Sequence, residues 1–207
     1  MLHLTVLAAT GATGRELTRQ ALERGHTVTA VARNPARIDL PDSGRLVRVA
    51  ADVGDPASMA RALHDATIVV SGLGIAKGDK PGVLTAGARA VVAAHPERII
   101  WIGAFGTGAS AAVAGALTRT MLRLFLRAEL GDKVAADTIV LDAGGTVFHP
   151  GPLSDGPISP TRRTVSLDAV PRRLFPARVS RATVAAAILD HCELRDPAGG
   201  TLVPLEH

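Results

Sequence analysis

Several side-chain types are scarce in this chain of 207 residues, and each scarcity restricts its chemistry. There is no tyrosine, so no phenol can serve as a proton donor in catalysis. The single cysteine, Cys192, cannot form an internal disulfide. One tryptophan and four phenylalanines leave few rings to stack on bases, and the basic residues are spread along the chain. Nucleic-acid binding is therefore not expected.

Long apolar runs are also missing. No stretch approaches the roughly 20 residues needed to cross a bilayer. Met1 leads into the first predicted strand without the basic and apolar regions of a signal peptide. These features predict a cytoplasmic protein that does not act at a membrane. Its expected partner is a small-molecule substrate, and the sequence leaves open whether the protein is a monomer or a homodimer. No metal site is predicted.

The spacing of apolar residues predicts the fold class. Short buried strands alternate with helical patterns from residue 4 to residue 102, which favours an α/β, Rossmann-type, doubly wound parallel sheet. A helix is predicted to follow Ser180 as its N-cap, and 201–203 are predicted to form a final edge strand. With 47% hydrophobic residues, the chain suits one domain over 1–204, and 205–207 resemble the remnant of a purification tag.

A glycine-containing turn near the start of the chain carries the first functional signal. The apolar run 4–9 is followed by Gly11 and Gly14 and then by a helical pattern, so free backbone N–H groups and a helix N-terminus would point at one spot. The spacing is looser than the full dinucleotide fingerprint because Leu17 stands at the third glycine position, and an ordinary turn between strand and helix is the alternative. We predict that a dinucleotide pyrophosphate binds at Gly11, Ala12, Thr13, Gly14 and Arg15.

The ends of the next strands indicate which dinucleotide binds. Arg33 stands where an NAD-binding domain places an acidic residue on the ribose 2′-hydroxyl, and a guanidinium there suits the 2′-phosphate of NADP. Arg37 is predicted to reach the same phosphate, although Arg33 could instead stack on adenine and accept both cofactors. Further along the chain, Asp52 and Val53 are predicted to flank the adenine, and Leu73 and Gly74 to lie beside the phosphates and the nicotinamide ribose.

Four residues are candidates for the catalytic end of the site. Gly103 and Phe105 follow the fifth predicted strand, where chemistry is expected in an open parallel sheet, and their small neighbours suggest an open site. Lys133 precedes Asp137 by four residues on a predicted helix, a spacing that more often forms a surface ion pair than a catalytic couple. His149 begins a proline-rich loop and is either a proton donor or a structural histidine.

A set of short motifs in order spans almost the whole chain. They are TGATG at 10–14, VAR at 31–33, DV at 52–53, SGLG at 71–74, GAF at 103–105, HPGPLSDGP at 149–157 and SRATVA at 180–185. With these motifs the chain resembles the NmrA-like, atypical short-chain dehydrogenase/reductase families with an NAD(P)H-binding domain. Within them it is most similar to the small flavin reductase/biliverdin-IXβ reductase group. The resemblance implies that Thr13, Arg15, Arg33, Asp52, Val53, Leu73 and Gly74 line an NADP site.

The chain departs from these families in its acid–base groups. Typical members of the wider superfamily use a Tyr with a Lys four residues later, and the resembled reductases commonly carry a Ser where Gly103 stands. Three functions remain open. The first is an NADPH-dependent reductase that transfers a hydride to a planar conjugated acceptor such as a flavin or quinone. The others are a catalytically idle NADP(H)-sensing module, and a non-redox isomerase or cyclase that uses Lys133 or His149.

Overall fold

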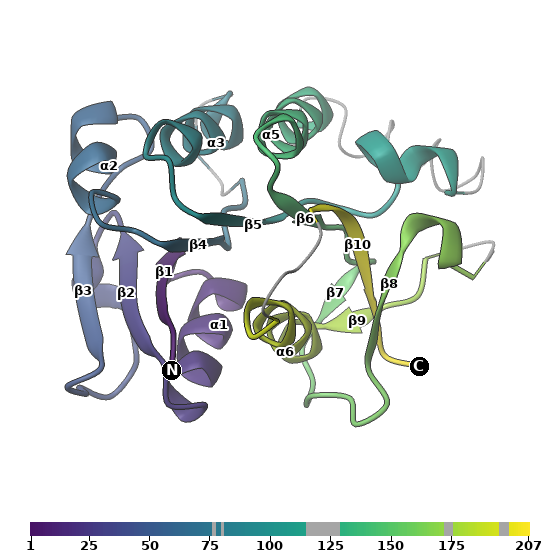
Figure 1. The fold of residues 1–207 in the computed structure, drawn as a ribbon, viewed down its shortest axis with the longest axis horizontal. Coiled ribbons are helices and arrows are strands. Elements are labelled where there is room, and N and C mark those ends of the chain that lie inside the picture. Colours follow the sequence, from purple (N-terminus) through teal and green to yellow (C-terminus); the bar gives the residue numbers. More distant parts are fainter. Residues whose placement is uncertain (76–77, 80, 115–128, 172–175, 195–198) are drawn as a thin grey trace.

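The computed structural model describes residues 1–75, 78–79, 81–114, 129–171, 176–194 and 199–207. An eight-stranded sheet forms its middle layer, with the strand order β3-β2-β1-β4-β5-β6-β10-β8 (Figure 1). The strands of this sheet are β1 (His3–Leu7), β2 (Thr27–Ala32), β3 (Leu46–Ala50), β4 (Ile68–Ser71), β5 (Arg98–Ile102), β6 (Thr146–Phe148), β8 (Arg163–Ser166) and β10 (Gly200–Leu205). The order runs outward in both directions from β1 and β4, which makes the sheet doubly wound, as predicted.

Helices cover both faces of the sheet. In Figure 1, α1 and α6 lie on one face, and α2, α3 and α5 lie on the other. Two apolar clusters match these layers: one includes Leu17 of α1 and Ile188 of α6, and the other includes Met59 of α2, Leu84 of α3 and Val140 of α5. The helices are α1 (Ala12–Glu23), α2 (Pro56–Ala62), α3 (Val83–Ala93), α5 (Leu130–Asp142) and α6 (Arg181–Cys192).

Short strands and 3-10 helices complete the fold. A second sheet contains two parallel strands, β7 (Leu153–Ser154) and β9 (Val179–Ser180). The described part of the chain also forms the 3-10 helices η1 (Pro35–Arg37), η2 (Gly108–Ala112) and η3 (Leu167–Ala169). Because β9 runs directly into α6, the β7–β9 pair brings the segment after β6 next to the N-terminus of α6.

The prediction of 201–203 as an edge strand is wrong. β10 pairs in parallel with β6 on one side and antiparallel with β8 on the other, so β8 is the edge of the sheet. Strand β10 also continues to Leu205, and the Glu206 carboxylate accepts a hydrogen bond of 2.7 Å from the Ser180 backbone N–H. The domain limit at 204 and the origin of 205–207 as a tag remnant stay predictions.

Candidate functional site

The turn between β1 and α1 is built by a close approach of two backbones. A Cβ on Gly14 would lie 2.2 Å from the carbonyl oxygen of Ala8, so only glycine lets α1 pack this tightly on the end of β1. Ala8 itself has a φ of +56°, in the left-handed region that side chains other than glycine rarely adopt. Gly72, which follows β4, packs against the same turn, because a Cβ there would lie 3.1 Å from the Gly14 Cα.

The N-terminus of α1 is left without a side-chain cap. Gly11 occupies the N-cap position, and within the described residues no side chain accepts a hydrogen bond from the first-turn N–H groups. These N–H groups and the positive end of the helix dipole face the space beyond the turn, an arrangement that suits a phosphate. The predicted phosphate site is thus chemically compatible with a dinucleotide.

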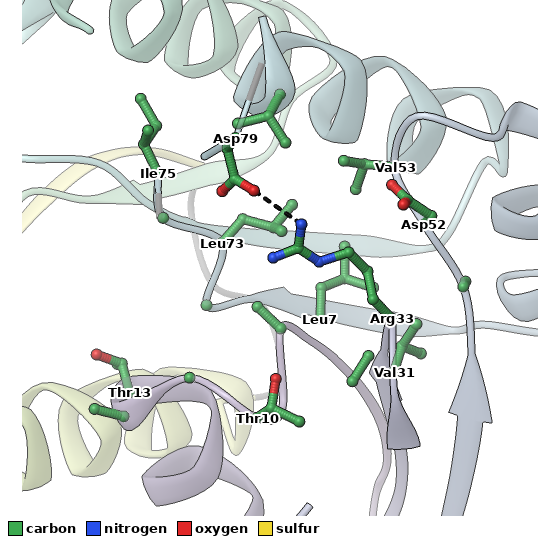
Figure 2. Close-up of a pocket in the computed structure, with 18 of the residues that line it drawn as sticks. Leu7, Thr10, Thr13, Val31, Arg33, Asp52, Val53, Leu73, Ile75 and Asp79 are labelled. Carbon is green, nitrogen blue, oxygen red and sulfur yellow. Dashed lines mark hydrogen bonds and ion pairs between the residues drawn. The ribbon is translucent and has the colours of Figure 1, made fainter. Parts of the chain in front are cut away.

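A pocket of about 580 Å³ opens over this turn at the carboxyl ends of the strands (Figure 2). Its walls come from 7–8 and 10–13 at the end of β1 and after it, 31–33 at the end of β2, 51–53 after β3 and 72–75 after β4. Such a volume lies within the range of small-molecule and cofactor sites. The pocket continues past the turn to Glu129, Lys133, Leu153 and Arg181, which lie beyond the predicted phosphate site.

Arg33 forms an ion pair at the other end of this pocket. Its side chain extends from the end of β2 towards the loop before α3, where its Nη1 lies 2.8 Å from the Asp79 Oδ1 (Figure 2). The Arg33 side chain is 63% exposed, whereas that of Asp79 is only 8% exposed. The Arg33 guanidinium thus lies at the end of the second strand, where the sequence predicted a ribose-binding residue, and it is paired with the Asp79 carboxylate.

Most of the predicted cofactor residues lie together in this pocket. The ones that line it are Gly11, Ala12, Thr13, Arg33, Asp52, Val53, Leu73 and Gly74. Gly14 lies beneath the turn, and Arg37 lies in η1 outside the lining. Arg15 faces a neighbouring groove of about 510 Å³, which shares Ala12 and Arg181 with the pocket. The Asp52 carboxylate accepts a 2.9 Å hydrogen bond from the Gly54 N–H, so it also stabilises its own turn.

Lys133 is placed by the packing of α5 on α3. Asp132, one residue earlier, accepts hydrogen bonds from the backbone N–H groups of Leu84 and Thr85 and from the Thr85 hydroxyl. Burial alone would raise the pKa of Asp132, but these hydrogen bonds outweigh it and hold the pKa below its usual value. The carboxylate thereby ties the first turn of α5 to the N-terminus of α3, and Glu129 and Lys133 both line the pocket.

The other catalytic candidates, Gly103, Phe105 and His149, are not among the residues that line the pocket, and His149 belongs to a buried polar cluster. His149 is fully buried, with its Nδ1 2.7 Å from the Ser110 Oγ and its Nε2 3.0 Å from the Asp137 Oδ2. The second carboxylate oxygen of Asp137 has no hydrogen-bond partner among the described residues. The Phe105 N–H donates to the Pro150 carbonyl, which ties the segment after β5 to the one after β6.

Two expectations about this region are corrected by that cluster. Asp137 is not part of a surface ion pair with Lys133, because it is 3% exposed and pairs with His149. The position of Gly103 is also not open, because a Cβ there would lie 2.7 Å from the His149 ring and 2.8 Å from the Asp137 Oδ2. The histidine ring and the carboxylate occupy the space that a side chain would need.

Several pocket residues were not predicted from the sequence. Asp79, Glu129, Leu153 and Arg181 all line the pocket. Two of them carry a signal that could have been used: Glu129 precedes Lys133 by one helical turn, and Arg181 follows the Ser180 N-cap, whose Oγ accepts from the Thr183 N–H at 3.0 Å. The arginines at 119, 123 and 127, which form a regularly spaced stripe in the sequence, lie outside the described residues.

Comparisons with known proteins define the class. The profile of the NAD(P)H-binding family matches residues 8–193, and the chain therefore belongs to this family. No curated protein matches the sequence at a significant level.

Within the described residues, no helix is long and apolar enough to span a membrane, and no three His, Cys, Asp or Glu side chains are grouped to hold a metal ion.

Solved structures of similar fold come from several bacteria. A wide-type short-chain dehydrogenase/reductase from Veillonella parvula, in complex with NADP, is 16% identical, with a TM-score of 0.81 over 98% of this chain and 93% of that chain. The anaerobilin reductase ChuY from Escherichia coli is 20% identical, with a TM-score of 0.79 over 99% and 97%. A candidate NADH-flavin reductase from Streptococcus pneumoniae is 16% identical, with a TM-score of 0.81 over 100% of both chains. At these identities the likeness establishes a shared fold.

Proposed function

We propose that the protein is an NADPH-dependent reductase that transfers a hydride to a planar conjugated acceptor such as a flavin, a quinone or a tetrapyrrole. The observation that carries this proposal is the single pocket lining that joins the uncapped α1 N-terminus, Arg33 at the end of β2, and Lys133 on α5. The names of two proteins of similar fold, an anaerobilin reductase and a candidate NADH-flavin reductase, support the reaction type.

Different residues of the pocket bind different parts of the dinucleotide. The N–H groups of Ala12 and Thr13 suit the pyrophosphate, and Arg33 supplies positive charge for the 2′-phosphate. The apolar side chains of Val31 and Val53, near the ends of β2 and β3, give the pocket a surface for the adenine ring. When bound, reduced nicotinamide supplies the hydride, and the protein contributes proximity and orientation.

A conjugated acceptor fits the acid–base groups of the site. The chain has no tyrosine, and both ring nitrogens of the buried His149 are already engaged in hydrogen bonds, with Ser110 and Asp137. A flavin or quinone takes its proton from water after it receives the hydride, so it needs no phenol from the protein. Lys133, which lines the far end of the pocket with Glu129, supplies a positive charge that favours an acceptor on which negative charge develops.

The test is the oxidation of NADPH, followed by its absorbance, with a flavin, a quinone and a tetrapyrrole as acceptors. We expect turnover with at least one acceptor, and a fall of about tenfold or more in kcat/KM for Lys133→Ala. A matched control is Lys133→Arg, which keeps the charge. Tight NADPH binding without turnover on any acceptor would refute the reductase.

A second candidate is an idle NADP(H)-sensing module. It is favoured by the packing of Gly103 against His149, which removes the predicted open space after β5. This alternative predicts that NADPH binds but is not consumed, and that the affinity for a partner protein differs between NADP and NADPH. Equal partner affinity with both nucleotides would argue against it.

A further inference from the structure

The Arg33–Asp79 ion pair places an acidic side chain where the proposed cofactor brings a phosphate. Both residues line the same pocket, and Figure 2 shows the Arg33 guanidinium extending from the end of β2 to the Asp79 carboxylate. The Nη1–Oδ1 distance of 2.8 Å is that of a charge-assisted hydrogen bond, so one nitrogen of the guanidinium is engaged before any nucleotide arrives.

We propose that Asp79 is a specificity-determining residue that competes with the 2′-phosphate of NADP for Arg33. A 2′-phosphate bound by Arg33 would carry close to two negative charges and would share one guanidinium with the Asp79 carboxylate. Either the phosphate binds next to a like charge, or Asp79 gives up its contact with Arg33, and both cost binding free energy.

Because Asp79 is buried, its competition with the phosphate is stronger than that of a carboxylate in an exposed surface ion pair. Its side chain is 8% exposed, so solvent and salt screen its charge less than they screen the 63% exposed Arg33. The 2′-hydroxyl of NADH is neutral and has no charge to repel. Asp79 therefore lowers the affinity for NADPH more than the affinity for NADH. It reduces the preference for NADPH over NADH that Arg33 alone would give.

This inference rests on the proposed binding of NADP(H) in the pocket, and its test is a measurement of binding that needs no acceptor. Asp79→Asn keeps the shape of the side chain and removes its charge. We expect it to tighten NADPH and the fragment 2′,5′-ADP by about three- to thirtyfold, and to change NADH and 5′-ADP by less than about twofold. The matched control is Asp65→Asn, which makes the same change in net charge at a side chain that is 94% exposed and outside the pocket lining.

A double-variant cycle isolates the role of Arg33. In the background of Arg33→Ala, we expect the gain from Asp79→Asn to fall below about threefold, because there is no longer a guanidinium to compete for. A full gain in that background would overturn the proposal. Asp79→Ser serves as a second variant, and thermal unfolding of each protein checks that it is folded.

The remaining outcomes are equally decisive. Equal tightening of NADPH and NADH, or no change in either, would show that Asp79 does not read the 2′-position. Weaker NADPH binding would show that Asp79 holds the Arg33 side chain in the conformation that binds the phosphate. Weaker NADH binding would show that Asp79 accepts a hydrogen bond from the 2′-hydroxyl. Each of these results contradicts the competition. A wild-type protein that binds neither nucleotide would instead refute the proposed function itself.

Discussion

Replacement of Gly14 by alanine tests the close packing that shapes the phosphate turn. The new Cβ would lie 2.2 Å from the Ala8 oxygen, 2.8 Å from the Ala8 carbonyl carbon and 3.1 Å from the Ala9 Cα. Ordinary contacts begin at about 3.4 Å, and all three atoms are backbone, so α1 must move away from β1. Overpacking of this kind costs about 3 kcal/mol, and the better helix propensity of alanine returns about 1 kcal/mol.

The expected net loss for Gly14→Ala is therefore about 2 kcal/mol, or about 4 to 8 °C in Tm for a chain of this length. Because the displaced turn carries the N–H groups of Ala12 and Thr13, NADPH affinity should fall by about tenfold or more. Urea denaturation and fluorescence titration of NADPH measure the two effects. The matched control is Gly131→Ala in α5, where a Cβ meets nothing within 4 Å, and we expect it to stabilise by about 0.5 to 1 kcal/mol. Wild-type stability and affinity in Gly14→Ala would refute the steric argument.

Three further predictions concern the buried polar groups. Asp137→Ala should destabilise the protein by about 3 kcal/mol in urea denaturation, because it leaves the buried Nε2 of His149 without its hydrogen-bond partner. Asp142→Ala on the exposed part of α5 should change stability by less than about 0.5 kcal/mol, and similar losses for both variants would contradict this prediction. Burial raises the pKa of the Cys192 thiol to about 12, so a thiol reagent should label it slowly in the native state and rapidly in urea, and fast native labelling would show that the site opens. Burial, together with the charge of Arg98, lowers the pKa of His191, so the folded state binds this proton more weakly than the unfolded chain does. The contribution of His191 to the free energy of unfolding is therefore complete above pH 6.5 and should be lost as the pH falls below that value towards the pKa of the folded state. His191→Gln should flatten this part of the stability curve, and an unchanged slope would contradict the assignment.

Local signals in the sequence were sufficient for most of the fold. Gly25 has a φ of +86° one residue after the C-cap of α1, and Pro56 begins α2 after the Asp55 N-cap; glycine after a helix and proline at its first position are familiar sequence signals. Ser180 caps α6 as predicted, with its Oγ accepting from the Thr183 N–H. Each of these signals depends on the conformation of only a few neighbouring residues, which is why it can be read without the tertiary structure.

The order of the last strands could not be predicted in the same way. An apolar strand of three residues reads alike at an edge and inside a sheet, and the placement of β10 between β6 and β8 depends on the return of the chain through β8. The pairing of β8 with β10 is antiparallel, whereas the rest of the large sheet is parallel. Tertiary packing, and not local pattern, decides this part of the topology.

The candidate site divides along the same line. Its nucleotide half follows strand ends, which meet at one edge of any parallel sheet, so residues such as Thr13 and Val53 could be placed from the sequence. The partner of Arg33 could not be placed, because Asp79 comes from a segment that only the folded chain brings near the end of β2. For the same reason, only the structure shows that Asp137 pairs with His149 and not with Lys133.

The central claim is that this pocket binds NADP(H) and that Arg33 reads the 2′-phosphate. Equilibrium titration of the wild-type protein and of Arg33→Ala with NADPH and NADH tests it most directly. We predict that the wild type prefers NADPH, and that Arg33→Ala weakens NADPH by about ten- to a hundredfold while NADH changes by less than about twofold. An equal loss for both nucleotides, or a wild-type protein that binds them equally, would contradict the account.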